Sequence, residues 1–165
     1  MPKPKYKTGL VVGKFLPPHR GHKFLIDTAV EQAEQVTVLI CQKDSYQIPA
    51  ELRASWVKEI HPTVKVVVID DRLDDDDSKG WAENTIKWLG QAPEAVFSSE
   101  DYGPVYATFM GADHVLVDRQ RVHVPASGTL LRRHPFIYWE FLEPPVRAYY
   151  ALRICVLGAE STGTT

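Results

Sequence analysis

The chain has 165 residues, of which 44% are hydrophobic and 24% are charged, and its formal net charge is −2. These values are those of one compact globular domain with room for a fragment of a second. The slight negative charge gives no support for nucleic-acid binding, and no apolar run is long enough to span a membrane. The first residues lack a signal-peptide core, and Cys41 and Cys155 lie in apolar runs, so we expect reduced, buried thiols in a cytoplasmic protein.

Apolar strands alternate with helices along the chain. We expect strands at Leu10–Gly13, Val36–Cys41, Val64–Ile69, Ala95–Ser98 and His114–Val117. We expect helices at Gly21–Ala33, Ala50–Ile60, Gly80–Leu89 and Pro104–Met110. This alternation predicts an α/β fold, a Rossmann-like doubly wound parallel sheet covered on both faces. Ligands of such sheets bind beyond the carboxyl ends of the strands.

An acidic run, Asp70–Asp77, follows the third strand. All of its residues are aspartates except one arginine and one leucine. A cluster of carboxylates could hold a metal ion. A run of this kind is more often a solvated loop, and we adopt that interpretation. We therefore expect no metal site built from protein ligands.

The passage from the first strand to the first helix carries the strongest chemical signal. The strand ends at Gly13, Lys14 and Phe15 follow, and His19 and His22 flank Gly21 at the start of the helix. Backbone N–H groups and the positive end of a helix dipole meet there, which favours an anion. Two imidazoles at that point can hydrogen-bond a phosphoryl group, so the segment predicts a nucleotide site. The alternative is a capping or surface histidine.

A second element lies about a hundred residues downstream, in the run Ala126-Ser127-Gly128-Thr129-Leu130-Leu131-Arg132. Ser127 and Thr129 can cap a helix, and Arg132 would lie one turn further on. Its planar guanidinium suits phosphate oxygens.

These two elements resemble the signature of the nucleotidyltransferase α/β-phosphodiesterase superfamily. Its members carry a [His/Thr]-x-Gly-His motif, seen here as His19-Arg20-Gly21-His22, and a later Ile-Ser-x-Thr-x-x-Arg motif. Ala126 departs from the isoleucine of the second motif. Residues 6–150 further resemble the NadR-type nicotinamide mononucleotide (NMN) adenylyltransferases, in four segments: Gly13–His22, Ile48–Arg53, Phe97–Gly103 and Val124–Thr129.

The resemblance implies that ATP and NMN react to give NAD and pyrophosphate, by attack of the NMN phosphate on the α-phosphorus of ATP. It implies that His19, His22, Lys14 and Arg132 stabilise the reacting phosphates. Backbone groups near Gly13 and Phe15, the open space at Gly21, and Ser127 and Thr129 would bind the nucleotide. Mg²⁺ would arrive on the ATP phosphates, and the resemblance also implies a homo-oligomer.

Residues for the second substrate are less defined by the sequence. Arg53, at the start of the second helix, either reaches the mononucleotide or a phosphate or is a solvent-facing arginine. Trp81 is a candidate for stacking on the cationic nicotinamide ring. We expect substrate contacts also after the fourth strand, where carboxylates could bind ribose hydroxyls, although Tyr102 could simply pack; these residues are Ser99, Glu100, Asp101 and Tyr102.

Other functions remain open on the sequence alone. Related enzymes use the same motif to transfer adenylyl or cytidylyl groups to pantetheine phosphate, flavin mononucleotide or other acceptors. A protein that senses nucleotides without turning them over is a second alternative. We expect such a sensor to have lost one of the histidines or the arginine, and all are present here.

The last residues predict the start of another domain. We assign residues 1–150 to the nucleotidyltransferase domain and residues 151–165 to the start of a P-loop kinase-like domain. The run Gly158–Thr165 resembles a Walker A loop, but Thr164 stands where the phosphate-binding lysine belongs. We therefore expect no kinase activity from these 165 residues.

Overall fold

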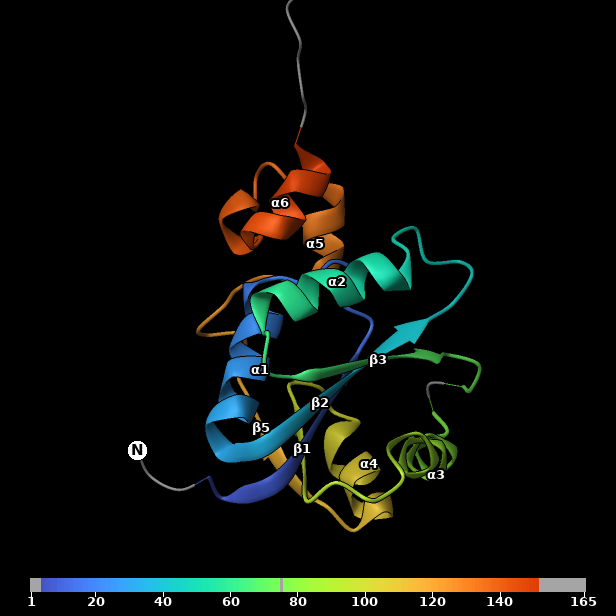
Figure 1. The fold of residues 1–165 in the computed structure, drawn as a ribbon. Coiled ribbons are helices and arrows are strands. Elements are labelled where there is room, and N and C mark those ends of the chain that lie inside the picture. Colours follow the sequence, from blue (N-terminus) through green and yellow to red (C-terminus); the bar gives the residue numbers. More distant parts are fainter. Residues whose placement is uncertain (1–3, 75, 152–165) are drawn as a thin grey trace, which may run out of the picture.

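The computed structural model describes residues 4–74 and 76–151 and contains one five-stranded sheet (Figure 1). Every pair of neighbouring strands is parallel. The strands are β1 (Tyr6–Gly13), β2 (Ala33–Gln42), β3 (Lys65–Asp70), β4 (Ala95–Ser98) and β5 (Asp113–Leu116), in the order β3-β2-β1-β4-β5. The predicted α/β class and parallel sheet are confirmed.

All four predicted helices are present, as α1 (Arg20–Gln32), α2 (Ala50–Ile60), α3 (Ser78–Leu89) and α4 (Gly103–Met110). Helix α3 begins two residues earlier than expected because Asp77 caps it, with Oδ1 accepting the backbone N–H of Gly80 at 2.9 Å. Later in the chain come α5 (Gly128–Arg133), a short 3-10 helix, η1 (Trp139–Phe141), and α6 (Pro144–Tyr150).

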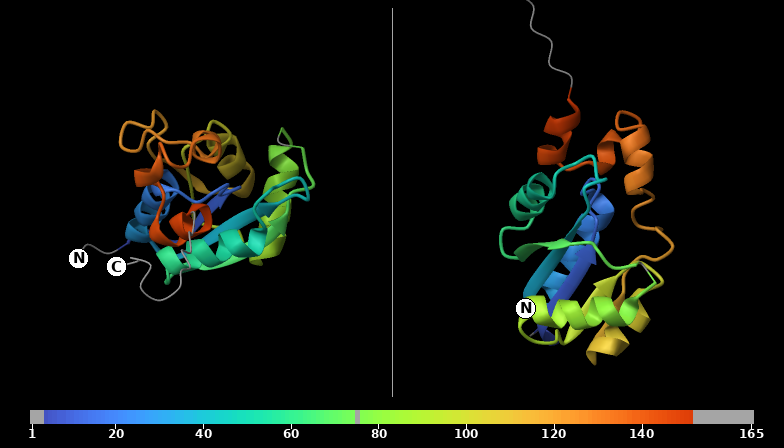
Figure 2. Two further views of the ribbon diagram at one scale, coloured as in Figure 1. Left: turned by 90° about the horizontal axis from the view of Figure 1, so that it is seen from above. Right: turned by 90° about the vertical axis from the view of Figure 1, so that its right-hand side faces the viewer.

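The sheet separates two apolar layers. Consecutive strand residues point to opposite faces, and both members of pairs such as Leu10 and Val11 are fully buried. The layer that contains Val11 is covered by α1 and α2, and the layer that contains Leu10 is covered by α3 and α4 (Figures 1 and 2). This arrangement is the doubly wound architecture expected from the sequence.

A third apolar cluster joins α2 to the C-terminal helices. Trp56 of α2 packs with Leu131 of α5 and with Leu142 and Val146 around α6, and the last three side chains are fully buried. In Figure 1 these helices lie together at one end of the molecule, next to α2. This packing fixes the segment before α5 over the carboxyl ends of the strands.

The strand order creates a crevice next to β1. From β1 the chain moves outward through β2 and β3, then returns to β4 on the other side of β1 and continues to β5. The connections that leave β1 and β4 therefore run to opposite faces of the sheet. Open parallel sheets bind ligands at such a switch point.

The interpretation of Asp70–Asp77 as a solvated loop is wrong for one residue. Asp71 is only 3% exposed, and its Oδ2 accepts the hydroxyl of Tyr46 at 2.6 Å. The ammonium of Lys43 lies 3.2 Å from its other oxygen. Asp71 directly follows β3, so the end of that strand places it at the crevice instead of in solvent.

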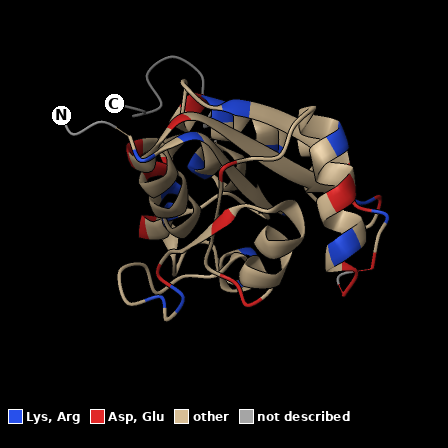
Figure 3. Ribbon diagram, turned by 90° about the horizontal axis from the view of Figure 1, so that it is seen from below, with Lys and Arg blue, Asp and Glu red and all other residues tan. Residues whose placement is uncertain are grey.

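The distribution of charge agrees with the small net charge of the chain. Basic and acidic segments are interspersed in Figure 3, and no wide basic face is visible in that view. The thiol of Cys41 is buried, as expected. Among the residues that the structure describes, no helix is both long and apolar enough to cross a bilayer. The predictions for Cys155 and for the Walker A-like run concern residues outside the described range.

Candidate active site

A cavity of about 840 Å³ opens at the carboxyl ends of the strands. Most of the side chains predicted from sequence line it: Gly13, Lys14, Phe15, His19, Gly21, His22, Trp81, Ser99, Glu100, Tyr102, Ser127, Thr129 and Arg132. Arg53 and Asp101 do not line it. The two motifs from opposite ends of the chain therefore meet in one cavity.

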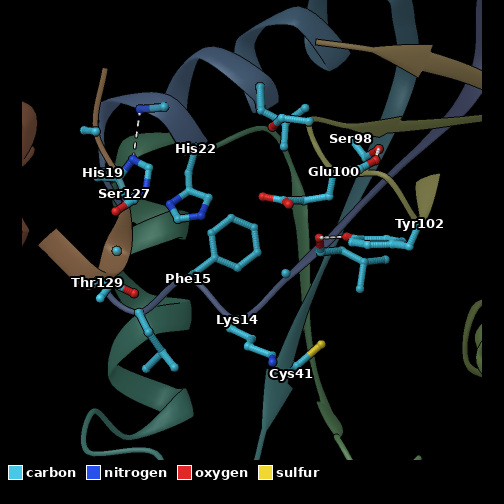
Figure 4. A pocket seen from close by; sticks show the side chains of 18 of the residues that line it. Lys14, Phe15, His19, His22, Cys41, Ser98, Glu100, Tyr102, Ser127 and Thr129 are labelled. Atoms are coloured by element: carbon cyan, nitrogen blue, oxygen red, sulfur yellow. Dashed lines mark hydrogen bonds between the residues drawn. The ribbon is translucent and has the colours of Figure 1, made fainter. Parts of the chain in front are cut away.

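The rings of the two histidines lie against each other in the cavity, tilted by 37° (Figure 4). The ring centroids of His19 and His22 are 3.9 Å apart, and the ring of His22 also lies 4.7 Å from that of Phe15. Phe15 is almost fully buried, and its ring packs against the His22 imidazole. The Nδ1 atom of His22 is shielded from solvent and has no hydrogen-bond partner among the described residues.

His19 caps α1 through its side chain. Its Nδ1 accepts the backbone N–H of Gly21 at 3.1 Å, so in the neutral ring the proton resides on Nε2. The Nε2–H group is thus available to donate to a phosphate oxygen. A Cβ on Gly21 would lie 2.9 Å from the His19 ring, which shows that this glycine makes room for the imidazole cap. Gly21 also lines the cavity, so the predicted substrate contact at this position stays a prediction.

Both imidazoles are uncharged at neutral pH in the free protein. Burial, followed by the charge of Arg121, lowers the pKa of His19 to about 4. Burial, followed by the charges of His19 and Arg121, lowers the pKa of His22 well below its usual value. The rings are therefore hydrogen-bonding groups in this state, and positive charge in the cavity comes from lysine and arginine.

The downstream motif docks on the loop after β1. The hydroxyl of Ser127 caps α5 by accepting the backbone N–H of Leu130 at 3.3 Å. The guanidinium of Arg132 donates to the carbonyl of Leu16 and, at 3.4 Å, to the hydroxyl of Thr129. These contacts place Arg132 beside residues 14–22, which carry His19 and His22 and are called the histidine loop below. The sequence interpretation required this position.

Arg53 has a different position from either alternative considered above. It is fully buried and donates to backbone carbonyls and to one side-chain amide. Its partners are the carbonyls of Lys14, Cys41 (2.9 Å) and Ile48 (2.9 Å) and Oε1 of Gln42 (2.5 Å). Arg53 thus ties the loop after β1 to the end of β2 from beneath the cavity.

The segment after β4 divides between the cavity and the surface. Ser99, Glu100 and Tyr102 line the cavity, and Figure 4 shows the Glu100 carboxylate pointing into the same space as the His22 ring. The hydroxyl of Tyr102 donates to the carbonyl of Val12 at 3.3 Å. Asp101 instead points to the surface and pairs with Arg119 at 2.6 Å. A substrate contact from Asp101 is therefore not part of this arrangement.

Trp81 lies in the first turn of α3, on the side of the cavity away from α1. Its Nε1–H donates to the carbonyl of Asp74 at 3.1 Å, and its ring meets that of Trp88 edge to face. Both contacts restrain the indole ring while it lines the cavity. The position is compatible with stacking on a ligand ring.

Sequence reasoning missed several polar residues that line the cavity, among them Tyr46, Asp71 and Arg121. The place of Asp71 directly after the third strand was a usable signal, because the carboxyl ends of parallel strands meet at one edge. Arg121 gave no such signal. It lies in an irregular loop between β5 and α5, where no periodic pattern predicts which way a side chain points.

Within the described part of the chain, no three histidine, cysteine or acidic side chains are grouped in a way that could hold a metal ion. The carboxylates that line the cavity have partners of their own. Asp71 accepts from Tyr46, Glu100 lies 3.6 Å from Arg121, and Asp118 accepts backbone N–H groups. A cation that arrives on the phosphates of a nucleotide fits this cavity better than one held by protein ligands.

The model of the cytidylyltransferase-like family matches residues 10–133. This span includes every side chain that lines the cavity. The chain belongs to the cytidylyltransferase-like family. The family lies within the nucleotidyltransferase superfamily, so the superfamily resemblance drawn from the two motifs is confirmed.

Curated relatives of this cytidylyltransferase-like chain are trifunctional NAD biosynthesis/regulator proteins named NadR. The protein of Escherichia coli (strain K12) is 28% identical over 98% of this chain, and that of Salmonella typhimurium (strain LT2) is 27% identical over the same share. The alignment covers 45% of each relative. The chain thus spans a little under half of the length of these relatives.

Solved structures share the fold of this cytidylyltransferase-like domain. A NadR protein in complex with NAD and AMP-PNP superposes with a TM-score of 0.71 at 19% identity, over 96% of this chain and 50% of that one. A NadR protein in complex with NR gives a TM-score of 0.73 at 20% identity, over 98% and 50%. At these identities the likeness concerns the fold.

Replacing Arg53 by lysine should destabilise the domain by about 2–4 kcal/mol, because an ammonium cannot reach all the acceptors of the planar guanidinium and leaves buried carbonyls unpaired. Urea unfolding measures this change. Arg72→Lys is the matched control, since the Arg72 side chain is 83% exposed and its loss should change stability by less than about 0.5 kcal/mol. Equal stabilities for the two variants would contradict the assigned role of Arg53.

Stability should also depend on pH through His19. Burial lowers the pKa of His19 from 6.5 to about 4, so the unfolded chain takes up this proton first as the pH falls. The contribution is complete above about pH 6.5 and is lost towards pH 4, with a size on the order of 3 kcal/mol. His19→Asn keeps an acceptor for the Gly21 N–H and does not titrate.

Urea unfolding of both proteins between pH 7 and pH 4 measures the difference. The unfolding free energy of His19→Asn should fall less steeply than that of the wild type over this range. Parallel curves would show that His19 titrates alike in the folded and unfolded chains.

Proposed function

We propose that this domain transfers the adenylyl group of ATP to NMN, giving NAD and pyrophosphate. The observation that carries the proposal is the convergence of His19, His22 and Arg132 on one cavity at the switch point of the sheet. Membership of a nucleotidyltransferase family and similarity to NadR proteins support the choice of reaction. ATP, NMN and NAD are then the small-molecule partners.

The reaction needs alignment and charge stabilisation more than acid–base catalysis. A phosphate oxygen of NMN attacks the α-phosphorus of ATP, and a new P–O bond forms as the bond to the leaving pyrophosphate breaks. The attacking phosphate is already anionic, so no covalent intermediate and no strong base are required. Catalysis of such a step rests on positioning and on hydrogen bonds to the developing charge.

The geometry suggests a division of roles among the residues of the histidine loop. His22 donates to the α-phosphate as charge shifts towards the leaving group, and the Nε2–H of His19 donates beside it. Lys14 adds positive charge at the end of β1, and the backbone around Phe15 contacts a phosphate. Neutral imidazoles suit this role, because they donate hydrogen bonds without requiring a charged, buried ring before ATP binds.

The downstream motif would bind the β- and γ-phosphates. Ser127 and Thr129 offer hydroxyl groups, and Arg132 offers a guanidinium that already contacts the loop after β1. Charge-assisted bonds from Arg132 would stabilise the departing pyrophosphate. Mg²⁺ would be bound through phosphate oxygens and water, and it would neutralise part of the charge of the triphosphate.

The acceptor would occupy the side of the cavity lined by Trp81. An aromatic face suits the cationic pyridinium of NMN. Ser99, Glu100 and Tyr102 at the end of β4 supply polar groups for a ribose or an amide. Assembly into a homo-oligomer and a cytoplasmic location stay predictions.

His22→Ala should lower kcat by about 10²–10³, similar to the loss of one oxyanion-hole donor. The assay mixes the protein with ATP, MgCl₂ and NMN and follows dinucleotide and pyrophosphate. His134→Ala is the control, because His134 is exposed and does not line the cavity. A folded His22→Ala protein with full turnover would remove His22 from the mechanism.

The same assay separates the proposal from its rivals. NMN should be a better acceptor than nicotinic acid mononucleotide, pantetheine phosphate or flavin mononucleotide, and ATP a better donor than CTP. Turnover of a different pair would keep nucleotidyl transfer and overturn the NAD assignment. Binding of NAD without pyrophosphate release from any pair would identify a sensor.

Trp81→Ala should raise the KM for NMN about tenfold and change the KM for ATP little, since the expected stacking is worth about 1.4 kcal/mol. Trp81→Phe keeps an aromatic face and should recover most of the loss. Phe109→Ala, on the exposed side of α4, serves as a control outside the cavity. An unchanged KM for NMN in Trp81→Ala would rule out the stacking contact.

A further inference from the structure

We propose that Arg121 binds the β- and γ-phosphates of the nucleotide. In the free protein, Glu100 pairs with Arg121 and keeps its guanidinium at the edge of the cavity. This inference rests on the proposed function, because it assigns a further residue to the same site. Neither motif contains Arg121, and no pattern in the sequence points to it. The argument comes from its contacts, from the loop that carries it and from the charges around it.

The contacts place the guanidinium between the downstream motif and the segment after β4. Its Nη1 donates to the carbonyl of Ala126 at 3.4 Å, one residue before Ser127. Its Nη2 lies 3.6 Å from Oε1 of Glu100, in the segment after β4. Arg121 also lines the cavity. It therefore lies beside the downstream motif at the cavity.

The positive charge of Arg121 affects the pKa of both imidazoles. Burial is the main reason that the pKa of His19 and the pKa of His22 are low, and the Arg121 charge lowers both further. A cation that influences both rings lies close to the place where they would meet a phosphate. This effect agrees with the position given by the hydrogen bonds.

The loop is built to hold this residue. The carboxylate of Asp118 accepts the backbone N–H groups of Val122 (2.8 Å), His123 (3.2 Å) and Val124 (3.1 Å). Asp118 and Arg121 both have positive φ angles, of 45° and 52°, in the left-handed region that non-glycine residues seldom adopt. The hydrogen bonds of the Asp118 carboxylate stabilise this unfavourable backbone conformation. They thereby fix the direction in which the Arg121 side chain points.

The site needs a further cation. The imidazoles are neutral in the free protein, and Arg132 already donates to Leu16 and Thr129. A triphosphate carries several negative charges, and among the described residues the two motifs supply only Lys14 and Arg132 as cations at the cavity, where Arg121 would add a third positive charge. The Arg121–Glu100 pair is open to solvent, with side chains 48% and 59% exposed, and such pairs contribute little to stability. A polyphosphate can therefore take Arg121 from Glu100 at small cost.

The test compares two arginines of the same loop by calorimetric titration. Arg121→Gln should weaken binding of ATP with MgCl₂ about 10- to 100-fold and change binding of AMP less than about twofold, because AMP lacks the two outer phosphates. Arg119→Gln is the matched control. Arg119 pairs with the surface residue Asp101 and does not line the cavity, so its loss should leave both affinities unchanged.

A third variant tests the part played by Glu100. Glu100→Gln removes the competing carboxylate and should tighten ATP binding about two- to fivefold in the wild-type background. In Arg121→Gln the same change should have no effect, since the partner is gone. Circular dichroism confirms that each variant is folded.

Either of two results would overturn the proposal: Arg121→Gln binding ATP as tightly as the wild type, or losing AMP and ATP affinity equally. Unchanged ATP binding in Glu100→Gln would overturn the role of Glu100. These titrations need no acceptor, so they stand apart from the test of NMN as substrate. A wild-type protein that makes NAD while Arg121→Gln keeps full ATP affinity would refute this inference alone.

Discussion

The buried guanidinium of Arg53 is the constraint on which the site depends. One planar group binds carbonyls from the loop after β1, from the end of β2 and from Ile48, just before α2. These three segments border the cavity. The position of the loop after β1 relative to the end of β2 decides where Lys14 and Phe15 lie. A buried cation is tolerated here because several carbonyl dipoles replace the water it has lost. Because the Phe15 ring packs against the His22 ring, the hydrogen bonds of Arg53 also help to position His22.

Above this anchor the protein keeps neutral and charged groups apart. The imidazoles sit deep and uncharged, whereas the guanidinium groups of Arg121 and Arg132 lie nearer to solvent at the rim. Burial makes a charged ring costly, and an exposed guanidinium keeps its hydration until a ligand replaces it. Such a division lets a polyanion enter along the charged rim and place one phosphate against the two rings. The free protein then carries little buried charge without a partner.

The parallel sheet and its helices could be predicted because the central strands are apolar on both faces and each connection is helical. The histidine loop and the Ser127–Arg132 segment could be found because their chemistry is encoded in short local runs. Arg53 was misread because a helix-start arginine looks the same in sequence whether its head group meets solvent, phosphate or backbone carbonyls. Asp71 was misread because neighbouring acidic residues concealed the one that follows directly from β3.

The sequence by itself determined the order of elements, the parallel sheet and the two motifs that meet in the cavity. These follow from local periodicity and from residue types at a strand–helix junction, which act over a few positions of the chain. Only the tertiary structure decided that Arg121 enters the cavity, that Asp101 leaves it and that Gly21 accommodates an imidazole. Those outcomes depend on loops whose direction is set by contacts between segments far apart in sequence, such as the docking of the Ser127 segment on Leu16.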